Sequence, residues 1–166
     1  MINKIQEPFE RGAGTLLPVA SLPSNYGIGT FGKAAYDFVD FLHKSGQKYW
    51  QVLPIGPTGY GDSPYQSFSA FAGNPYFIDF DLLIEENLLD ISEIEKINWG
   101  DNPSLIDYGK IYENRYSVLR VAFKNFNTSD ESFIEFCDAN SFWLDDYSDY
   151  MAIKDLFKGV EWLKWP

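Results

Sequence analysis

The sequence predicts an α/β fold in which a β-α-β unit precedes a mainly helical segment. Two short apolar runs, residues 13–19 and 49–55, flank an amphipathic pattern over residues 31–46. Parallel strands joined by a helix give this arrangement, and their crossover is right-handed. Gly and Pro concentrate in residues 11–80, whereas residues 81–166 are more charged and have helical spacing.

The first strand is expected over Ala13–Val19 and the second over Tyr49–Ile55, both as buried strands. Between them, Thr30 is expected to cap a helix, and Gly46 to end it. One apolar stripe should face the sheet. Its members are Phe31, Ala35, Phe38, Val39 and Leu42.

Two further helices are expected in the second half. The first is marked by Ile111, Tyr112, Tyr116, Leu119, Ala122, Phe123 and Phe126. The second opens at the capping box Thr128–Glu131 and ends at Gly159. Its apolar positions are Phe133, Phe136, Cys137, Leu144, Tyr147 and Met151, so Cys137 is expected to be a buried structural thiol. Two parallel strands alone leave both sheet edges unpaired, which indicates a piece of a larger fold.

Composition excludes several classes of function. Asp and Glu number 24 against 13 Lys and Arg, a net charge of −11 that disfavours nucleic acids and anionic membranes as partners. A single cysteine, Cys137, and a single histidine, His43, exclude an internal disulfide and metal sites of several thiolates or imidazoles. No apolar run reaches the roughly 20 residues of a membrane span, and the N-terminus lacks a signal-peptide core. We therefore expect a cytoplasmic protein without a metal.

Residues 27–32 spell GxGxxG, a weak pattern on its own. Two prolines precede it, and no acidic residue follows the second strand at the place that dinucleotide binding needs. We interpret it as a turn and a helix start, with nucleotide binding as the less favoured alternative. His43, near the end of the first helix, is interpreted as a surface residue.

Residues 56–80 form an aromatic loop directly after the second strand, where α/β folds place their active sites. Tyr and Phe alternate there with Gly, Ser and Ala, and Asp62 is the only charge between Gly56 and Ile78. With Ser63, Gln66 and Asn74 it supplies donors and acceptors for hydroxyl groups. This mixture suits a neutral polyhydroxylated ligand, although a packed loop without any ligand has the same composition.

A glycosidic bond is usually broken by two carboxylates, about 5–5.5 Å apart in retaining enzymes. Asp62, Asp79 and Asp81 are the only acids near the loop. No catalytic pair can be assigned among them.

The run from Tyr49 to Tyr76 resembles the signature near the N-terminus of amylomaltases, the bacterial 4-α-glucanotransferases. Residues 14–18, 21–23 and 26–29 resemble the first strand of that family and its loop. Asp107–Gly109 with Tyr112, and Trp162–Pro166, resemble later landmarks. The similarity therefore spans nearly the whole chain in order.

The resemblance implies the N-terminal portion of a (β/α)8 TIM barrel, left incomplete. Residues 1–80 would form its first β-α-β unit with a glucan-binding loop, and residues 81–166 an inserted helical subdomain truncated at its C-terminus. The family transfers α-1,4-glucan segments to the 4-hydroxyl of glucose or a glucan, with retention and without a cofactor. Its partners would be maltooligosaccharides and starch- or glycogen-derived glucans. The nucleophilic Asp, the acid/base Glu and a third Asp come from later strands, so this chain alone is expected to be inactive.

For binding, the resemblance implies that Tyr65 lines the subsite of the reacting glucose, with Ser63 and Asp62 beside it. Tyr60 and Tyr112 match tyrosines of a second glucan groove, although the spacing of Tyr112 also fits the core face of a helix. The main alternative is a non-catalytic α-glucan-binding or regulatory protein. A debranching relative is less favoured, because the run from Tyr60 to Tyr76 is typical of amylomaltases.

Overall fold

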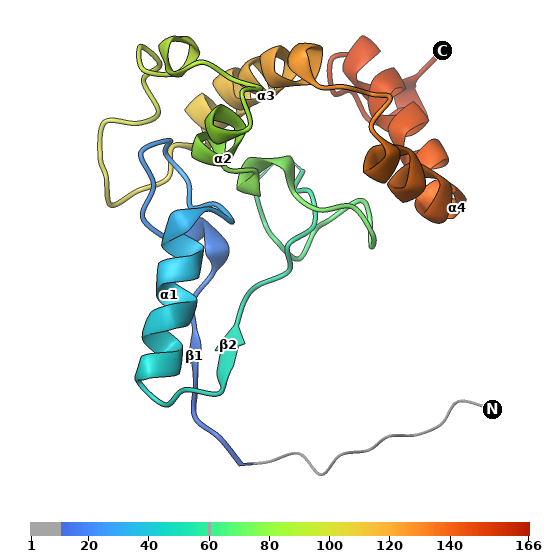
Figure 1. Ribbon diagram of the computed structural model, residues 1–166. Coiled ribbons are helices and arrows are strands. Elements are labelled where there is room, and N and C mark those ends of the chain that lie inside the picture. Colours follow the sequence, from blue (N-terminus) through green and yellow to red (C-terminus); the bar gives the residue numbers. More distant parts are fainter. Residues whose placement is uncertain (1–10, 60) are drawn as a thin grey trace, which may run out of the picture.

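A computed structural model describes residues 11–59 and 61–166 of the chain. The β-α-β unit consists of β1 (Gly14–Leu16), α1 (Lys33–Lys44) and β2 (Tyr49–Gln51). The strands are parallel, with Thr15 opposite Trp50, which confirms the predicted unit. Residues 52–79 then connect it to α2 (Phe80–Glu85), α3 (Tyr108–Asn125) and α4 (Glu131–Leu156), which lie at the opposite end of the molecule from the strands' starting points (Figure 1). Four 3-10 turns complete the described part: Val19–Ser21, Pro75–Phe77, Ile91–Glu93 and Trp162–Lys164.

Both strands are shorter and more exposed than the sequence predicts. Pro18 lacks a backbone N–H and precedes the 3-10 turn at Val19, and Pro54 likewise cannot donate to a ladder. Over the described residues the sheet has only these two strands, so no further strand pairs with the free edge of either one. Leu16 is consequently 55% exposed, and Val52 and Ile55 are exposed too. The prediction of buried strands is wrong for this chain.

Helix α1 begins three residues after Thr30. Gly32 is its N-cap residue, without a side-chain cap, so the predicted Thr30 cap is wrong. The buried Thr30 instead donates its hydroxyl hydrogen bond to Asp79. The predicted end is confirmed: Gly46 has a φ of +70°, and its N–H donates to the His43 carbonyl at 3.0 Å.

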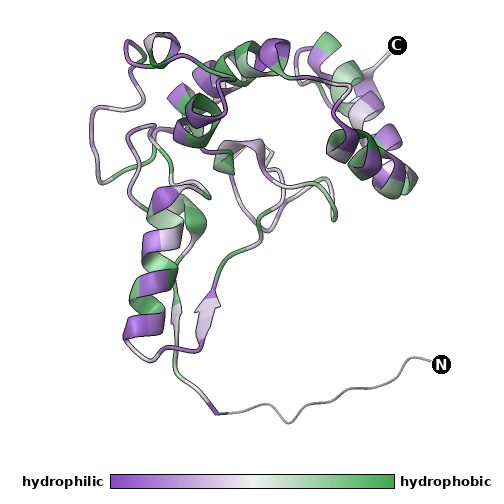
Figure 2. Ribbon diagram, in the orientation of Figure 1, coloured by the Kyte–Doolittle hydropathy of each residue, from purple (hydrophilic) through white to green (hydrophobic). Residues whose placement is uncertain are grey.

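The apolar stripe of α1 is only partly covered. Ala35 and Leu42 are buried, and Phe38 packs edge-on against Trp50 with ring centroids 5.1 Å apart. Phe31 and Val39, predicted on the same stripe, are exposed because a sheet of two strands is too narrow to cover them. Figure 2 shows the mixed hydrophilic and hydrophobic bands of α1 beside the strands.

The main core joins the loop after β1 to the helices α2 and α3. Phe80 and Ile111 are fully buried within it. The Phe80 ring lies 5.3 Å from that of Tyr26 and 5.6 Å from that of Trp99, so segments far apart in sequence meet there. The whole cluster is Tyr26, Ile28, Tyr76, Phe80, Leu89, Ile94, Trp99, Ile111, Val118 and Ala122.

Arg115 on α3 is a charged residue in this core and has no exposed surface. One terminal nitrogen donates a hydrogen bond to the Ile78 carbonyl, and the guanidinium lies over the Phe80 ring, 4.3 Å from its centroid. Burial lowers the pKa of Arg115 to about 10, while the nearby Asp79 acts in the opposite direction. Arg115 therefore ties the end of the aromatic loop to α3.

Helix α4 packs more loosely than its sequence predicts. Asp130 is its N-cap and accepts hydrogen bonds from the N–H groups of Ser132 and Phe133, so the helix begins after Asp130 rather than after Thr128. No residue of α4 is buried, and Cys137 is half-buried rather than buried. The end of the helical stretch at Gly159 is confirmed by its φ of +79° and by its hydrogen bond to the Lys154 carbonyl.

We expect Ile111→Ala to lower the free energy of unfolding of the 166-residue chain by about 2–5 kcal/mol, because it empties a fully buried position. Phe123→Ala on the exposed side of α3 is the matched control, with an expected change within about 0.5 kcal/mol. Urea unfolding followed by far-UV circular dichroism measures both. Equal losses in the two variants would contradict the assigned core.

Candidate substrate-binding site

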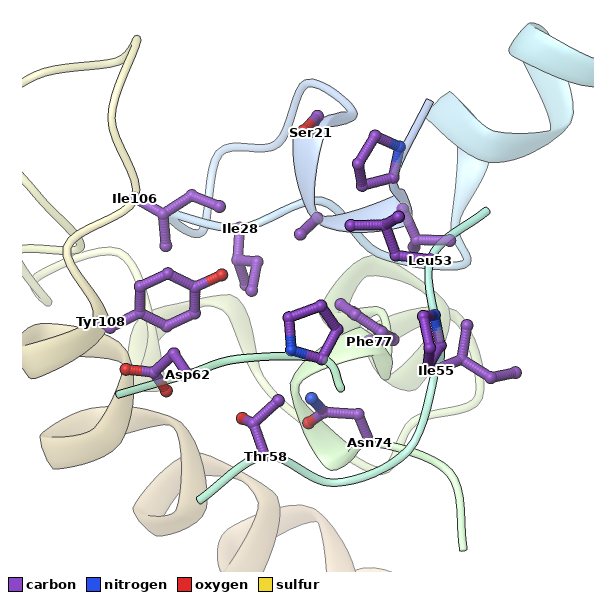
Figure 3. A pocket seen from close by; sticks show the side chains of 15 residues that line it. Ser21, Ile28, Leu53, Ile55, Thr58, Asp62, Asn74, Phe77, Ile106 and Tyr108 are labelled. Carbon is purple, nitrogen blue, oxygen red and sulfur yellow. The ribbon is translucent and has the colours of Figure 1, made fainter. Parts of the chain in front are cut away.

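A cavity of about 180 Å³ lies at the carboxyl ends of the two strands. Its walls include Pro18–Ser21, which follows β1, and Leu53–Ile55, which follows β2. Figure 3 shows Leu53 and Ile55 on one side of the cavity, with Asp62 and Tyr108 on the opposite side. Because parallel α/β folds bind ligands at this edge, the cavity is the first candidate for a site.

The aromatic loop and α3 close the cavity. Asp62 comes from the loop, and Asn74 and Phe77 from its end. Tyr108, the first residue of α3, contributes a phenol from the other side (Figure 3). The Asp107 carboxylate caps α3 by accepting from the Lys110 N–H at 3.1 Å, and this cap fixes where Tyr108 stands.

Among the residues that the structure describes, Asp62 is the only charged one that lines the cavity. Its φ of +53° is left-handed, a conformation that Asp tolerates better than most residues, and its N–H donates to the Gly59 carbonyl at 3.1 Å. Burial raises the pKa of the Asp62 carboxyl above its ordinary value. Burial and the charge of Asp62 also raise the pKa of the Tyr108 phenol.

Thr58 offers an unused hydroxyl in the same cavity. Its Oγ1 is buried and has no hydrogen-bond partner in the described part of the chain. The neighbouring Asn74 is engaged differently, because its Oδ1 accepts from the Tyr76 N–H at 2.9 Å. A buried hydroxyl without a partner is costly, and a ligand hydroxyl could satisfy it.

The site residues that the resemblance implies fall in different places. Of these, Asp62 lines the cavity, whereas Ser63 is half-buried and Tyr65 is 73% exposed, both outside the cavity wall. Tyr60 lies outside the described residues. Among these implied residues, the loop therefore brings Asp62 to the cavity and leaves Tyr65 at the surface.

Tyr112 lies on the exposed side of α3. It is 65% exposed, while the preceding Ile111 is fully buried. The interpretation of Tyr112 as a core residue is therefore wrong. Within the described residues, no hydrogen bond or ring contact joins Tyr112 to Asp62, Ser63 or Tyr65.

The other two acids near the loop have structural partners. Asp79 is the N-cap of α2, accepting from the Leu82 N–H at 3.1 Å, and it also accepts from Thr30. Asp81 accepts a hydrogen bond from the Tyr26 hydroxyl. Neither carboxylate lines the cavity, so neither forms a pair with Asp62 across it.

The GxGxxG stretch is a turn and a helix start, as predicted. Gly27 has a φ of +77° and packs against the Trp99 carbonyl. At Gly32, a side chain would collide with the Asp79 carboxylate. This negative charge stands at the start of α1, where a phosphate would need donors, and it disfavours the nucleotide alternative. His43 is exposed, as expected.

Residues 11–59 and 61–166 contain no cluster of three His, Cys, Asp or Glu side chains suited to a metal ion. Over the same residues, no helix is both long and apolar enough to cross a bilayer.

Sequence reasoning missed Thr58, Tyr108 and Ser21 as cavity residues. The position of Thr58 in the sequence is a usable signal, because it lies in the same aromatic loop as Asp62 and Ser63. No local pattern places Tyr108 beside Asp62, because 46 residues separate them in the chain. Their proximity depends on how α2 and α3 pack.

Comparison with known proteins decides the family. The family model described as 4-alpha-glucanotransferase matches residues 17–166. This chain belongs to the 4-alpha-glucanotransferase family. The resemblance to amylomaltases is thereby confirmed.

Individual relatives agree with this assignment. A 4-alpha-glucanotransferase from Clostridium butyricum is 59% identical over 148 residues, covering 89% of this chain and 30% of the relative. One from Thermus thermophilus is 44% identical over 94% of the chain and 31% of its own length. The solved structure of an amylomaltase from Streptococcus agalactiae in complex with acarbose has a TM-score of 0.87 and 43% identity, covering 94% of this chain and 32% of that one. The chain spans about a third of the length of these relatives.

The raised pKa of Asp62 predicts how pH affects stability. A carboxyl with a raised pKa in the folded state binds its proton more tightly there, so its contribution to stability falls as pH rises through the interval between its unfolded and folded pKa values. Asn cannot ionise and also tolerates the left-handed backbone. We therefore expect Asp62→Asn to unfold at a higher urea concentration than the native chain at about pH 7.

The gain should disappear at about pH 3, where Asp62 is protonated in both the folded and the unfolded state. Asp138→Asn on the exposed surface of α4 is the control. A gain for Asp62→Asn that does not depend on pH would contradict the assigned origin.

Proposed function

We propose that the protein transfers α-1,4-glucan segments from a donor to the 4-hydroxyl of glucose or of another glucan, with retention of configuration. The observation that carries this proposal is the family match over residues 17–166, combined with a nearly uncharged cavity at the ends of the strands. In this proposal the chain contributes glucan binding, and the catalytic carboxylates belong to the two thirds of the family's length that it does not span.

The chemistry of the cavity suits a neutral sugar. Thr58 supplies an unpaired hydroxyl, and Asp62 and Tyr108 supply an acceptor and a phenol on the facing wall. Apolar side chains such as Ile28 and Phe77 line the rest. Sugar sites combine apolar faces with a few placed polar groups in this way.

Tyr65 is proposed to hold the reacting glucose. Its exposed ring stands on the loop that also carries Asp62, three residues away. A ring at the surface can stack on a sugar without losing core packing. Ser63 is proposed to assist on the same loop, and Tyr60 and Tyr112 to contact glucan in a second groove.

The chemistry proposed for the whole protein is a double displacement. A carboxylate attacks the anomeric carbon while a second carboxyl group protonates the departing glycosidic oxygen. The acceptor's 4-hydroxyl then displaces the enzyme carboxylate and loses its proton to the second group. Asp79 and Asp81 are held by structural hydrogen bonds, so they are poorly suited to these roles.

We also propose that β1, α1 and β2 begin a (β/α)8 barrel and that residues 81–166 form a helical insertion. The exposed apolar residues Leu16, Val52 and Ile55 support this, because further strands of a barrel would cover them. The maltooligosaccharides and the starch- or glycogen-derived glucans of the family are the proposed substrates. The acarbose complex of the Streptococcus agalactiae amylomaltase supports ligands of this class.

The first test separates binding from chemistry. We expect the 166-residue chain alone not to convert maltotriose into glucose and longer maltodextrins. A chimera in which this chain replaces the matching 30% of the Clostridium butyricum relative should do so. Chromatography of the products measures both. Conversion by the chain alone, or an inactive but folded chimera, would overturn the proposal.

The second test concerns Tyr65. In the same chimera, we expect Tyr65→Ala to lower kcat/KM for maltotriose by about 10-fold or more, because the reacting sugar is held less firmly. Tyr65→Phe should retain most activity if stacking is the main contribution. Tyr36→Ala, on the exposed side of α1, is the matched control. Unchanged kinetics in Tyr65→Ala would show that the loop ring does not contact the substrate.

A further inference from the structure

The aromatic loop of residues 56–80, proposed above to bind the substrate, has few backbone contacts that fix its position. At its base, the Asn74 N–H donates to the Ile55 carbonyl at 2.8 Å. Further along, Thr58 and Ser67 form a single antiparallel bridge. This bridge lies at the base of the loop's tip, whose described residues 61–66 include Asp62, Ser63 and Tyr65. Two turn hydrogen bonds, from the Asp62 and Gln66 N–H groups, lie within the tip itself. Because only one bridge joins this Gly- and Ser-rich segment to the rest of the loop, the position of the tip is weakly fixed.

Helix α4 contacts the loop just beyond this bridge. The Phe71 ring stacks on Trp143 with centroids 5.8 Å apart and planes at 21°. The same ring meets Phe142 edge-on at 5.4 Å. Phe71, although 63% exposed, thus contacts two aromatic side chains of one helix in geometries that aromatic pairs favour.

A second contact lies next to the bridge itself. The Lys154 Nζ stands 4.3 Å from the centroid of the Phe68 ring and 5.9 Å from that of Tyr150. Phe68 and Tyr150 are 6.4 Å apart. Since Phe68 directly follows Ser67, this cation–π contact acts on the residue adjoining the bridge.

These contacts are among the main attachments of α4 to the rest of the described chain. None of its residues belongs to the main core, and none is buried. Its ion pair between Asp155 and Arg120 on α3, at 2.6 Å, is exposed and contributes little stability. Three of its aromatic side chains, Phe142, Trp143 and Tyr150, therefore contact the loop, whereas Phe133 packs against Phe126 at 5.2 Å.

We propose that α4 is a brace for the aromatic loop, and that Trp143 and Lys154 are positioning residues that fix the tip of this loop at residues 61–66. The brace acts through Phe71 and Phe68 on the Thr58–Ser67 bridge, and through the bridge on Tyr65. This inference rests on the proposed function, because it assigns α4 a part in holding the glucan.

The first test measures the position of the tip without using activity. In the chimera, Lys154→Met should speed amide hydrogen exchange in residues 61–66 by about 3-fold or more, with exchange in the core of α3 unchanged. Trp143→Ala should do the same, whereas Trp143→Phe and Lys154→Arg should restore slow exchange. Lys124→Met on α3 is the matched control. Exchange at 61–66 that does not respond to Lys154→Met or to Trp143→Ala would overturn the brace.

The second test is kinetic. We expect Lys154→Met and Trp143→Ala to raise KM for maltotriose about 3- to 10-fold, with a smaller change in kcat and an unchanged Tm. A double-mutant cycle of Lys154→Met with Phe68→Leu should be non-additive, since both changes remove one contact. Additive effects, or a KM equal to that of Lys124→Met, would overturn the brace.

The two proposals fail differently. An inactive parent chimera, or wild-type kinetics in Tyr65→Ala, would remove the proposed function while hydrogen exchange still tests the brace. An active chimera that depends on Tyr65 but not on Lys154 or Trp143 would keep the function and remove the brace.

Discussion

A buried guanidinium holds the central part of this structure together. Arg115 has no exposed surface, donates to the Ile78 carbonyl and lies over the Phe80 ring. Removing a charge from water is costly, so the surrounding groups must hold it in one position. Two of its nitrogens, Nε and Nη1, have no hydrogen-bond partner in the described chain, which raises the cost of burying the charge. The contact fixes the end of the aromatic loop against α3 and so sets Phe77 on one wall of the cavity opposite Tyr108 on another.

The cavity follows from this arrangement. Its strand-side walls come from the segments that follow β1 and β2. These contain Pro18 and Pro54, neither of which can donate to a strand ladder, so the pairing of the two strands stops there. Its other walls come from the loop and from the capped start of α3. Most of the charged residues behind the net charge of −11 lie outside the cavity, since Asp62 is the one charged residue of the described chain that lines it. A strongly acidic chain thus keeps a site suited to an uncharged ligand.

The sequence predicted what local chemistry determines. The β-α-β order, the stop at Gly46, the two later helices and the stop near Gly159 each depend on periodicity or on a residue that accepts a left-handed backbone. The prediction of the cap of α1 was wrong because a group distant in sequence takes the hydrogen bond of the predicted capping residue. Thr30 was predicted as a cap, but the Asp79 carboxylate, 49 residues away, takes its hydroxyl. The burial of the strands was predicted from their apolar character, which says nothing about how many strands are present to cover them.

The site was predictable to the same degree. The aromatic loop and Asp62 could be found from composition and position, but Tyr108 could not, because its place depends on the packing around Arg115. The exposure of Tyr112 also depended on the tertiary arrangement, since Tyr112 and the buried Ile111 are adjacent in sequence and only the orientation of α3 distinguishes them.

The carboxylate of Asp79 at the start of α1 has a consequence for position 32 of the chain. The N–H groups at the start of a helix attract anions, and many barrel enzymes hold phosphate near the carboxyl ends of their strands. Here Gly32 leaves room for Asp79 instead, so a negative side chain already stands where such a phosphate would be held. The close approach also couples two helix starts. Any residue larger than glycine at position 32 would displace the carboxylate that accepts from Thr30 and caps α2.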